Sequence, residues 1–204
     1  LTPLISFRYS PNKGFNLKNE KELIRFQDLF NLDRVSNKTI ESRESVTLGL
    51  EYKNQNKFNR DRINLGLGVN LKTKEDEDLP VSTTLNKKTS DIIGYSGINI
   101  TENLSIGYNF SIDENLSDTN YSLASLKYNS SIFSTSFEYM EKSQPIGEES
   151  YLNNVSKVII NNNNSLAFET NKNLDKNLTD YYNLIYKYKN DCLEASVIYN
   201  KQFY

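Results

Sequence analysis

Apolar and polar residues alternate with a period of two along much of this chain, and that period strongly constrains the possible fold. In SVTLGLEY, residues 45–52, the apolar side chains fall on one side of an extended backbone and Thr47, Gly49 and Glu51 on the other. DRINLGLGVNLK (61–72) and LSIGYNFSID (104–113) repeat the pattern. A period of two is typical of half-buried β-strands.

Weaker alternation predicts eight further strands, at about 3–9, 91–100, 121–128, 131–139, 150–160, 165–173, 180–188 and 192–200. The total of about eleven strands predicts an all-β fold, an antiparallel up-and-down meander. One stretch, NEKELIRFQDLF (19–30), has a helix-like pattern, but it is short and lies inside a long connection. We expect it to form a loop or a single turn.

The connections between these strands alternate in length, and one face of the strands is rich in Asn, Ser, Gly, Lys and Glu. The long connections are 10–42, 72–90, 113–119 and 140–149, and the shorter ones are 53–60, 101–103, 129–130, 161–164 and 189–191. Long loops at one end and short turns at the other are typical of an outer-membrane β-barrel, with the short turns in the periplasm. Because bacterial single-chain barrels close with an even number of strands, we expect part of a transmembrane barrel, an open curved sheet.

In such a barrel the apolar face meets lipid and the polar face lines a wet lumen. Six tyrosines near strand ends fit an interfacial girdle, although tyrosine also has a high β-propensity (Tyr9, Tyr52, Tyr128, Tyr139, Tyr188 and Tyr199). The residues expected to face lipid are Val46, Leu48, Leu50, Leu65, Leu67, Ile106, Tyr108, Phe110, Phe133 and Phe137. Amides and hydroxyls expected on the lumen side are able to bond saccharides or simply hydrate the lumen (Asn64, Asn70, Asn109, Ser134, Ser136 and Asn183).

Composition argues against several functional classes. The net charge of −2 lacks the basic excess of a nucleic-acid-binding protein. With no histidine and a single cysteine, the usual catalytic triads and Cys/His zinc sites are excluded within this chain, and we expect neither an enzyme nor a cofactor. The run KEDED (74–78) offers carboxylates to a divalent cation but lacks the spacing of a calcium loop, so no metal site is expected there and a solvated loop is favoured.

Several stretches, taken in order, resemble the LptD (OstA) family of outer-membrane lipopolysaccharide-assembly proteins. In NLDRVSNKTIESRESVTLGLEY the resemblance rests on Asp33, Arg34, Arg43 and the Gly-Leu-X-Tyr strand ending at residue 52. SDIIG (90–94) and the final YKYKNDCLEASVIYNKQFY also resemble family segments. Two departures occur near the end: Leu193 stands where many members have a second cysteine, and Lys201 stands where arginine is common.

The resemblance implies that residues 1–204 are the C-terminal part of an outer-membrane β-barrel domain, with further strands and a periplasmic domain outside this chain. The function that it implies is transport of lipopolysaccharide and its insertion into the outer leaflet of the bacterial outer membrane. Sugars would cross the lumen while acyl chains leave sideways. The implied partners are lipopolysaccharide, outer-membrane lipid, a plug lipoprotein of the LptE kind and a periplasmic bridge protein of the LptA kind.

Cys192 lies in the last short turn, which the alternation of connections assigns to the periplasm. A structural cysteine in that oxidising compartment normally has a partner, and none exists in this chain. By resemblance to the family, we expect a disulfide from Cys192 to a cysteine in the periplasmic domain, the alternative being a free thiol. Two other functional classes stay open: a generic porin or nutrient-uptake barrel, and a soluble all-β adhesin or binding module.

Overall fold

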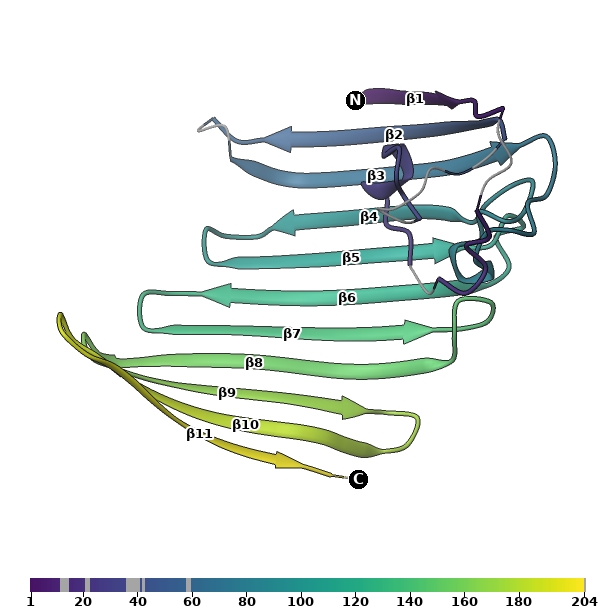
Figure 1. The fold of residues 1–204 in the computed structure, drawn as a ribbon. Helices are drawn as coiled ribbons and strands as arrows, with labels where there is room; N and C mark the ends of the chain where they lie inside the picture. The colour runs from purple at the N-terminus through teal and green to yellow at the C-terminus, as the bar shows by residue number, and fades with distance from the viewer. Residues whose placement is uncertain (12–14, 21–22, 36–40, 42, 58–59, 204) are drawn as a thin grey trace. The chain divides into compact units, whose positions relative to one another are not determined.

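The computed structural model describes residues 1–204 except 12–14, 21–22, 36–40, 42, 58–59 and 204. Eleven strands follow one another along the chain (Figure 1). They are β1 (Thr2–Arg8), β2 (Ser45–Gln55), β3 (Asp61–Lys72), β4 (Ile92–Asn99), β5 (Leu104–Ile112), β6 (Thr119–Asn129), β7 (Phe133–Lys142), β8 (Glu149–Asn161), β9 (Asn164–Asn173), β10 (Leu178–Lys189) and β11 (Glu194–Gln202).

All eleven strands belong to one sheet, in which each strand is hydrogen-bonded to its neighbours in sequence. The pairings are antiparallel; for example, Leu50 of β2 lies opposite Leu67 of β3. β1 and β11 are the two edges, so the sheet formed by the described residues is open. The predicted all-β antiparallel meander of about eleven strands is confirmed.

Successive connections in such a meander fall at opposite ends of the sheet. One end carries 9–44, 73–91, 113–118, 143–148 and 174–177, and the other carries 56–60, 100–103, 130–132, 162–163 and 190–193. The turn that contains Cys192 is therefore at the end where every connection is short. The connection 174–177 is also short, although it lies at the other end.

Helical structure is limited, in the described residues, to two 3-10 turns, η1 (Asp28–Phe30) and η2 (Val81–Thr83). The 19–30 stretch thus forms a loop with a single helical turn, as expected. In the part of the chain that the structure describes, no helix is long and apolar enough to cross a membrane.

The chain divides into two compact units. Unit 1 comprises residues 1–97, 108–122 and 142–148, and unit 2 comprises 98–107, 123–141 and 149–204. Unit 1 contains the buried apolar core, which the two longest connections build together with β4. Its members are Leu17, Ile24, Phe26, Leu29, Val35, Leu79, Leu85 and Ile93, with Leu4, Phe30 and Tyr95 packed against them.

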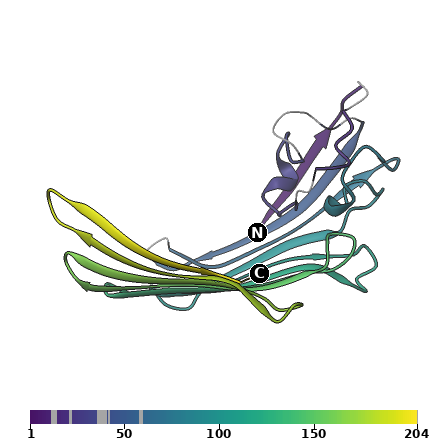
Figure 2. The same ribbon diagram turned by 60° about the horizontal axis from the view of Figure 1, so that its bottom comes forward.

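This core lies on one side of β2–β4, where Figures 1 and 2 show η1 and its flanking chain. Side chains of β2 and β3 that point toward it are the polar or small members of the alternating pattern, such as Gly49, Gly68 and Asn70. We call this the covered face of unit 1. Their alternation partners, including Leu48 and Leu67, point the other way and form the apolar face.

Candidate functional site

The covered face is shaped by three glycines that leave room for the loop segment 15–35. A Cβ atom added at Gly68 would lie 2.9 Å from Leu29 Cδ1 and 3.3 Å from Phe26 Cε2. A Cβ atom at Gly49 would lie 2.5 Å from Phe30 Cζ. A Cβ atom at Gly66 would clash with the Tyr95 ring. Aromatic and leucine side chains of the segment therefore pack directly against the strand backbone, where a real Cβ would exclude them.

Next to this core, the carboxylate of Glu41 is surrounded by three cations. Arg34 donates from Nε to Oε1 at 2.5 Å and from Nη2 to Oε2 at 2.8 Å. Arg8 of β1 donates to Oε1 at 3.3 Å, and Lys72 of β3 donates to Oε2 at 3.5 Å. The side chains of all four residues are at most 8% exposed. Glu41 thus ties the first long connection to the ends of two strands.

The protonation of Glu41 follows from these neighbours. Burial by itself would raise the pKa of Glu41, but the hydrogen bond from Arg34 and the positive charges of Arg34, Lys72 and Arg8 outweigh burial and hold that pKa below its ordinary value. Arg34 also reaches Leu29 O and Thr47 Oγ1, each at 3.3 Å. The Asp-Arg element of the sequence therefore supplies the residue that joins the segment, the carboxylate and β2.

The KEDED run is exposed at Lys74, Glu75 and Glu77, as expected of a solvated loop, but Asp76 departs from that expectation. It is 1% exposed, and its Oδ2 lies 4.0 Å from both Lys72 Nζ and Arg43 Nε. Its backbone N–H donates to Asn86 O at 2.8 Å. The charge belongs to the buried ionic cluster because it compensates the nearby cations. No group of three or more metal-ligating side chains occurs among the described residues.

A third buried carboxylate, Asp91, fixes the start of β4 in unit 1. Its Oδ2 accepts from Ser111 Oγ at 2.8 Å and from Asn120 Nδ2 at 2.7 Å, and its Oδ1 lies 3.8 Å from Lys87 Nζ. Asp91 is fully buried. The site therefore joins β4, β5 and β6 through side chains on the covered face.

The amides expected on the lumen side have different environments. Asn70 is buried and donates to Thr47 Oγ1 at 2.9 Å, so the expectation that it hydrates a lumen or bonds sugar is wrong, because the segment covers it. Asn64 and Asn183 donate to Asp61 and Glu169. Asn109, Ser134 and Ser136 are half-buried.

The residues predicted to face lipid are largely uncovered. In unit 1, Leu48, Leu50, Leu65, Leu67 and Tyr108 are between 39% and 47% exposed, while Val46 and Phe110 are half-buried. Gly94 shares their face, because a Cβ atom there would meet Phe110 and Leu67. In unit 2, Ile106, Phe133 and Phe137 are between 37% and 45% exposed.

In unit 2 the register of β8–β11 also defines two faces. Residues that lie opposite one another on neighbouring strands share a face. One such row across β8–β11 consists of Ser156, Phe168, Leu184 and Tyr199, and the next row, on the other face, consists of Lys157, Ala167, Ile185 and Ile198. We call the first the aromatic face, since it carries the Phe168, Tyr182 and Tyr199 rings. The second is the lysine face. Thr135 bonds Ser156 at 2.7 Å, which places Phe133 and Phe137 of β7 on the aromatic face.

Polar residues on the aromatic face bond one another. Asn154 donates to Thr135 Oγ1 at 3.2 Å and to Ser136 O at 3.0 Å, and it accepts from Ser156 Oγ at 3.1 Å. These hydrogen bonds satisfy amide and hydroxyl groups that would otherwise be costly beside an apolar medium.

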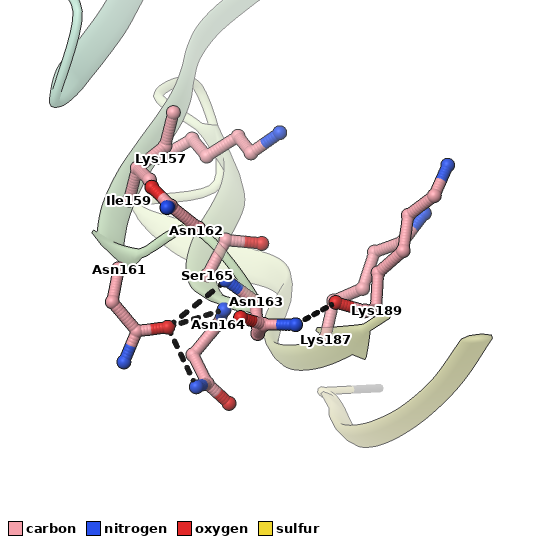
Figure 3. Close-up of a pocket in the computed structure, with 9 residues that line it drawn as sticks. All are labelled: Lys157, Ile159, Asn161, Asn162, Asn163, Asn164, Ser165, Lys187 and Lys189. Carbon is pink, nitrogen blue, oxygen red and sulfur yellow. Dashed lines mark hydrogen bonds between the residues drawn. The ribbon is translucent and has the colours of Figure 1, made fainter. Parts of the chain in front are cut away.

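At the short-turn end of unit 2, the lysine face is hollowed. Lys157, Lys187 and Lys189 line a hollow together with Ile159, Ser165 and the turn residues Asn161–Asn164 (Figure 3). The next turn along holds Cys192, which is exposed and whose thiol is free in the described chain. Asn190 Oδ1 accepts from the backbone N–H of Cys192 at 3.0 Å and of Leu193 at 2.7 Å, so the turn is well ordered by its own side chain.

Sequence reasoning missed the covered face. The available signal was the run of glycines on the polar side of the 45–52 and 61–72 alternation, opposite leucines. A strand interior seldom carries glycine unless another backbone or ligand comes close.

A known protein family matches most of this chain. The model of a family described as LptD, LPS transport system D, matches residues 1–191. The matched range includes β1–β10, the covered face and the hollow, while Cys192 and β11 lie beyond it. A search of curated proteins found no significant match.

Proposed function

This chain belongs to the LptD family of outer-membrane lipopolysaccharide transport proteins, and on that premise we propose that residues 1–204 form the C-terminal part of the barrel that carries lipopolysaccharide through the outer membrane. The family is one of transport and assembly proteins, not of enzymes. In the proposed barrel the apolar face of unit 1 and the aromatic face of unit 2 meet lipid, and the opposite faces line the lumen. Sugars pass along the lumen while the acyl chains leave sideways into the outer leaflet.

One observation carries this proposal: in unit 1 the leucine-rich face is uncovered while the polar face is covered. Leu48, Leu50, Leu65 and Leu67 remain about 40% exposed. Thr47 and Asn70, on the other face, are almost completely buried. A soluble module would bury the leucines, because burial of apolar area is the main source of stability in water. Lipid reverses that preference, since the outside of a barrel is an apolar band.

A pair of photoreactive substitutions tests the proposal in the full-length protein in cells. A photoreactive residue at Leu67 is expected to cross-link membrane lipid, and one at Asn109, which shares the covered face with Ser111, is expected to capture lipopolysaccharide during transport. Capture of lipid at Leu67 without lipopolysaccharide at Asn109 would favour a porin or uptake barrel. Absence of lipid cross-links at Leu67 would favour a soluble adhesin or binding module.

The proposed orientation puts the short-turn end in the periplasm and the long connections outside the cell. We further propose that Cys192 forms a disulfide there with a cysteine of a periplasmic domain outside these residues. The exposure of its thiol and the hydrogen-bonded turn that presents it support this pairing. Such a bond would hold the delivery domain beneath the lumen, where a bridge protein hands over lipopolysaccharide; a plug lipoprotein is the other proposed partner.

A non-reducing gel of the full-length protein checks the disulfide. Wild-type protein is expected to change mobility on reduction, and Cys192→Ser is expected to run at the reduced position under both conditions, because the long covalent loop is lost. Ser196→Ala, a small substitution in the strand that follows the turn, is the control and is expected to keep the wild-type change in mobility. If Cys192→Ser leaves the mobility of the oxidised band unchanged, Cys192 is a free thiol.

A further inference from the structure

The hollow on the lysine face of unit 2 combines positive charge with sugar-compatible polar groups. Its volume is about 290 Å³, and three lysines from two strands border it. The chains of Lys157, Lys187 and Lys189 extend on the same side of the Asn-rich turn (Figure 3). All three are accessible, with Lys187 at 42% and Lys189 at 68% side-chain exposure.

The positive charges of the three lysines outnumber the carboxylates that contact them. Glu194 of β11 pairs with Lys187, and its Oε2 lies 3.4 Å from Lys189 Nζ. Lys157 has no carboxylate partner within the described ranges. Three lysines against one glutamate leave the hollow with an excess of two positive charges. This excess would attract an anionic ligand, which would accept charge-assisted hydrogen bonds from the lysines.

The neutral part of the hollow is pre-formed. Asn161 Oδ1 accepts from the backbone N–H groups of Asn163 and Asn164, both at 3.0 Å, and from Asn164 Nδ2 at 2.8 Å. Asn163 Nδ2 donates to Lys189 O at 2.8 Å, and Lys189 N–H donates to Asn163 O at 2.8 Å. These bonds tie the turn to β10 beside the lysines. Ser165, directly opposite Lys187, adds a hydroxyl that sugar oxygens are able to bond.

We propose that this hollow binds a phosphate-bearing sugar, with Lys157 and Lys187 on the phosphate and the amides and Ser165 on the saccharide. The inference rests on the proposed transport function, in which the phosphorylated saccharide of a glycolipid enters at the short-turn end. The hollow lies at that end of β8–β10, one turn before Cys192. It would give the incoming headgroup its first charged contact on this wall.

The test uses the full-length protein in its membrane with a photoreactive residue at Ile159, which lines the hollow. Lipopolysaccharide is expected to cross-link there. Changing Lys157→Gln and Lys187→Gln together is expected to lower the cross-linked fraction roughly tenfold, because two charge-assisted contacts are lost. Lys157→Arg with Lys187→Arg is expected to restore it. Lys127→Gln, at an exposed strand lysine paired with Glu138 at 3.9 Å, is the matched control and is expected to leave it unchanged.

Probes added to the purified full-length protein identify the chemistry. Lipopolysaccharide treated with a phosphatase is expected to cross-link as weakly to the wild type as intact lipopolysaccharide does to the glutamine pair. Equal capture of both forms, or no effect of the glutamine pair, would overturn the inference. Displacement by inorganic phosphate alone at low millimolar concentration would assign the hollow to free phosphate instead.

The outcome also separates this inference from the function on which it rests. Capture at Asn109 with no dependence on the lysines would leave the transport function standing and remove the phosphosugar site. Loss of capture at both Asn109 and Ile159 in otherwise wild-type protein would count against transport itself.

Discussion

Glu41 is a carboxylate on which cations from three separate parts of the chain converge. Replacing it by glutamine would leave Arg8, Arg34 and Lys72 buried without the carboxylate that all three share. Removing one partner of a buried ion pair costs about 3–5 kcal/mol, so we expect Glu41→Gln to release the segment 15–35 from the covered face. Limited proteolysis of the folded protein would detect the release as new cleavage within that segment.

Glu44→Gln is the matched control, since Glu44 lies in the same connection but is only half-buried, and it accepts a hydrogen bond from Thr73 outside the buried cluster. It is expected to leave the cleavage pattern unchanged. Equal cleavage in the two variants would show that the buried cluster does not hold the segment.

Glu41 also makes the stability of the buried ionic cluster depend on pH, in a direction that its pKa fixes. The pKa of Glu41 is lowered in the folded protein, so the stability that it contributes is complete above its unfolded value of about 4.3. That contribution is lost as the pH falls through the lower, folded value. We expect protease protection of the segment to be constant from neutral pH down to about 4.3 and to decline below it. In Glu41→Gln this acid-dependent step should be missing.

At the level of the element, β3 depends on glycine for its fit to the segment. Gly68→Val would place branched carbons where Leu29 Cδ1 already lies 2.9 Å from a Cβ position, and Leu29 is fully buried. Overpacking of this kind costs about 1–3 kcal/mol. We expect Gly68→Val to lower the thermal midpoint of the detergent-solubilised protein.

Gly97→Val is the control for β-propensity and added bulk on a neighbouring strand. The nearest atom to a Cβ at Gly97 is Asn64 O at 4.0 Å, so no clash arises. A midpoint lowered equally by both substitutions would contradict the role given to the close approach at Gly68.

The strands themselves were predictable from sequence because their signal is local. SVTLGLEY and DRINLGLGVNLK carry the alternation within each strand, and short connections favour the meander order of β4–β11. The covered face was not predicted, because its contacts join residues far apart in the chain. Arg8 and Glu41 are separated by 33 positions, and Lys72 and Glu41 by 31.

Charged loop residues are usually solvated, and that prior gave the wrong environment for Asp76. Similarly, among the described residues of the 19–30 stretch the deeply buried apolar ones are Ile24, Phe26 and Leu29, and this spacing fits neither a strand nor a long helix. Its buried side chains pack into the space that Gly49, Gly66 and Gly68 leave on the strands, and no periodicity within the stretch itself predicts these contacts. The hollow could not be predicted from the sequence either, because the register of β8, β9 and β10 is what places Lys157 and Lys187 on the same face.

For the whole molecule, the proposed membrane position makes the apolar face intolerant of charge. Leu67→Arg, in the middle of β3, is expected to cost about 2–4 kcal/mol in a bilayer, and Leu71→Arg, near the strand end, about 0–1 kcal/mol. Folding into lipid vesicles under a urea gradient would measure both. Equal, small effects would mean that this face does not contact hydrocarbon.

Because Phe26 and Leu29 pack over Gly66 and Gly68, the middle of β3 is shielded on one side, and we expect this to affect the order in which the sheet opens. β9 is a fair comparison, since it too is paired on both sides, but its side chains are largely half-buried and it contributes no residue to the apolar core described above. We expect amide hydrogens of β3 to exchange with deuterium more slowly than those of β9 in detergent. Gly68→Val should narrow that difference. Local opening would then begin among β8–β11, leaving β2 and β3 as the last part of the wall to lose its hydrogen bonds.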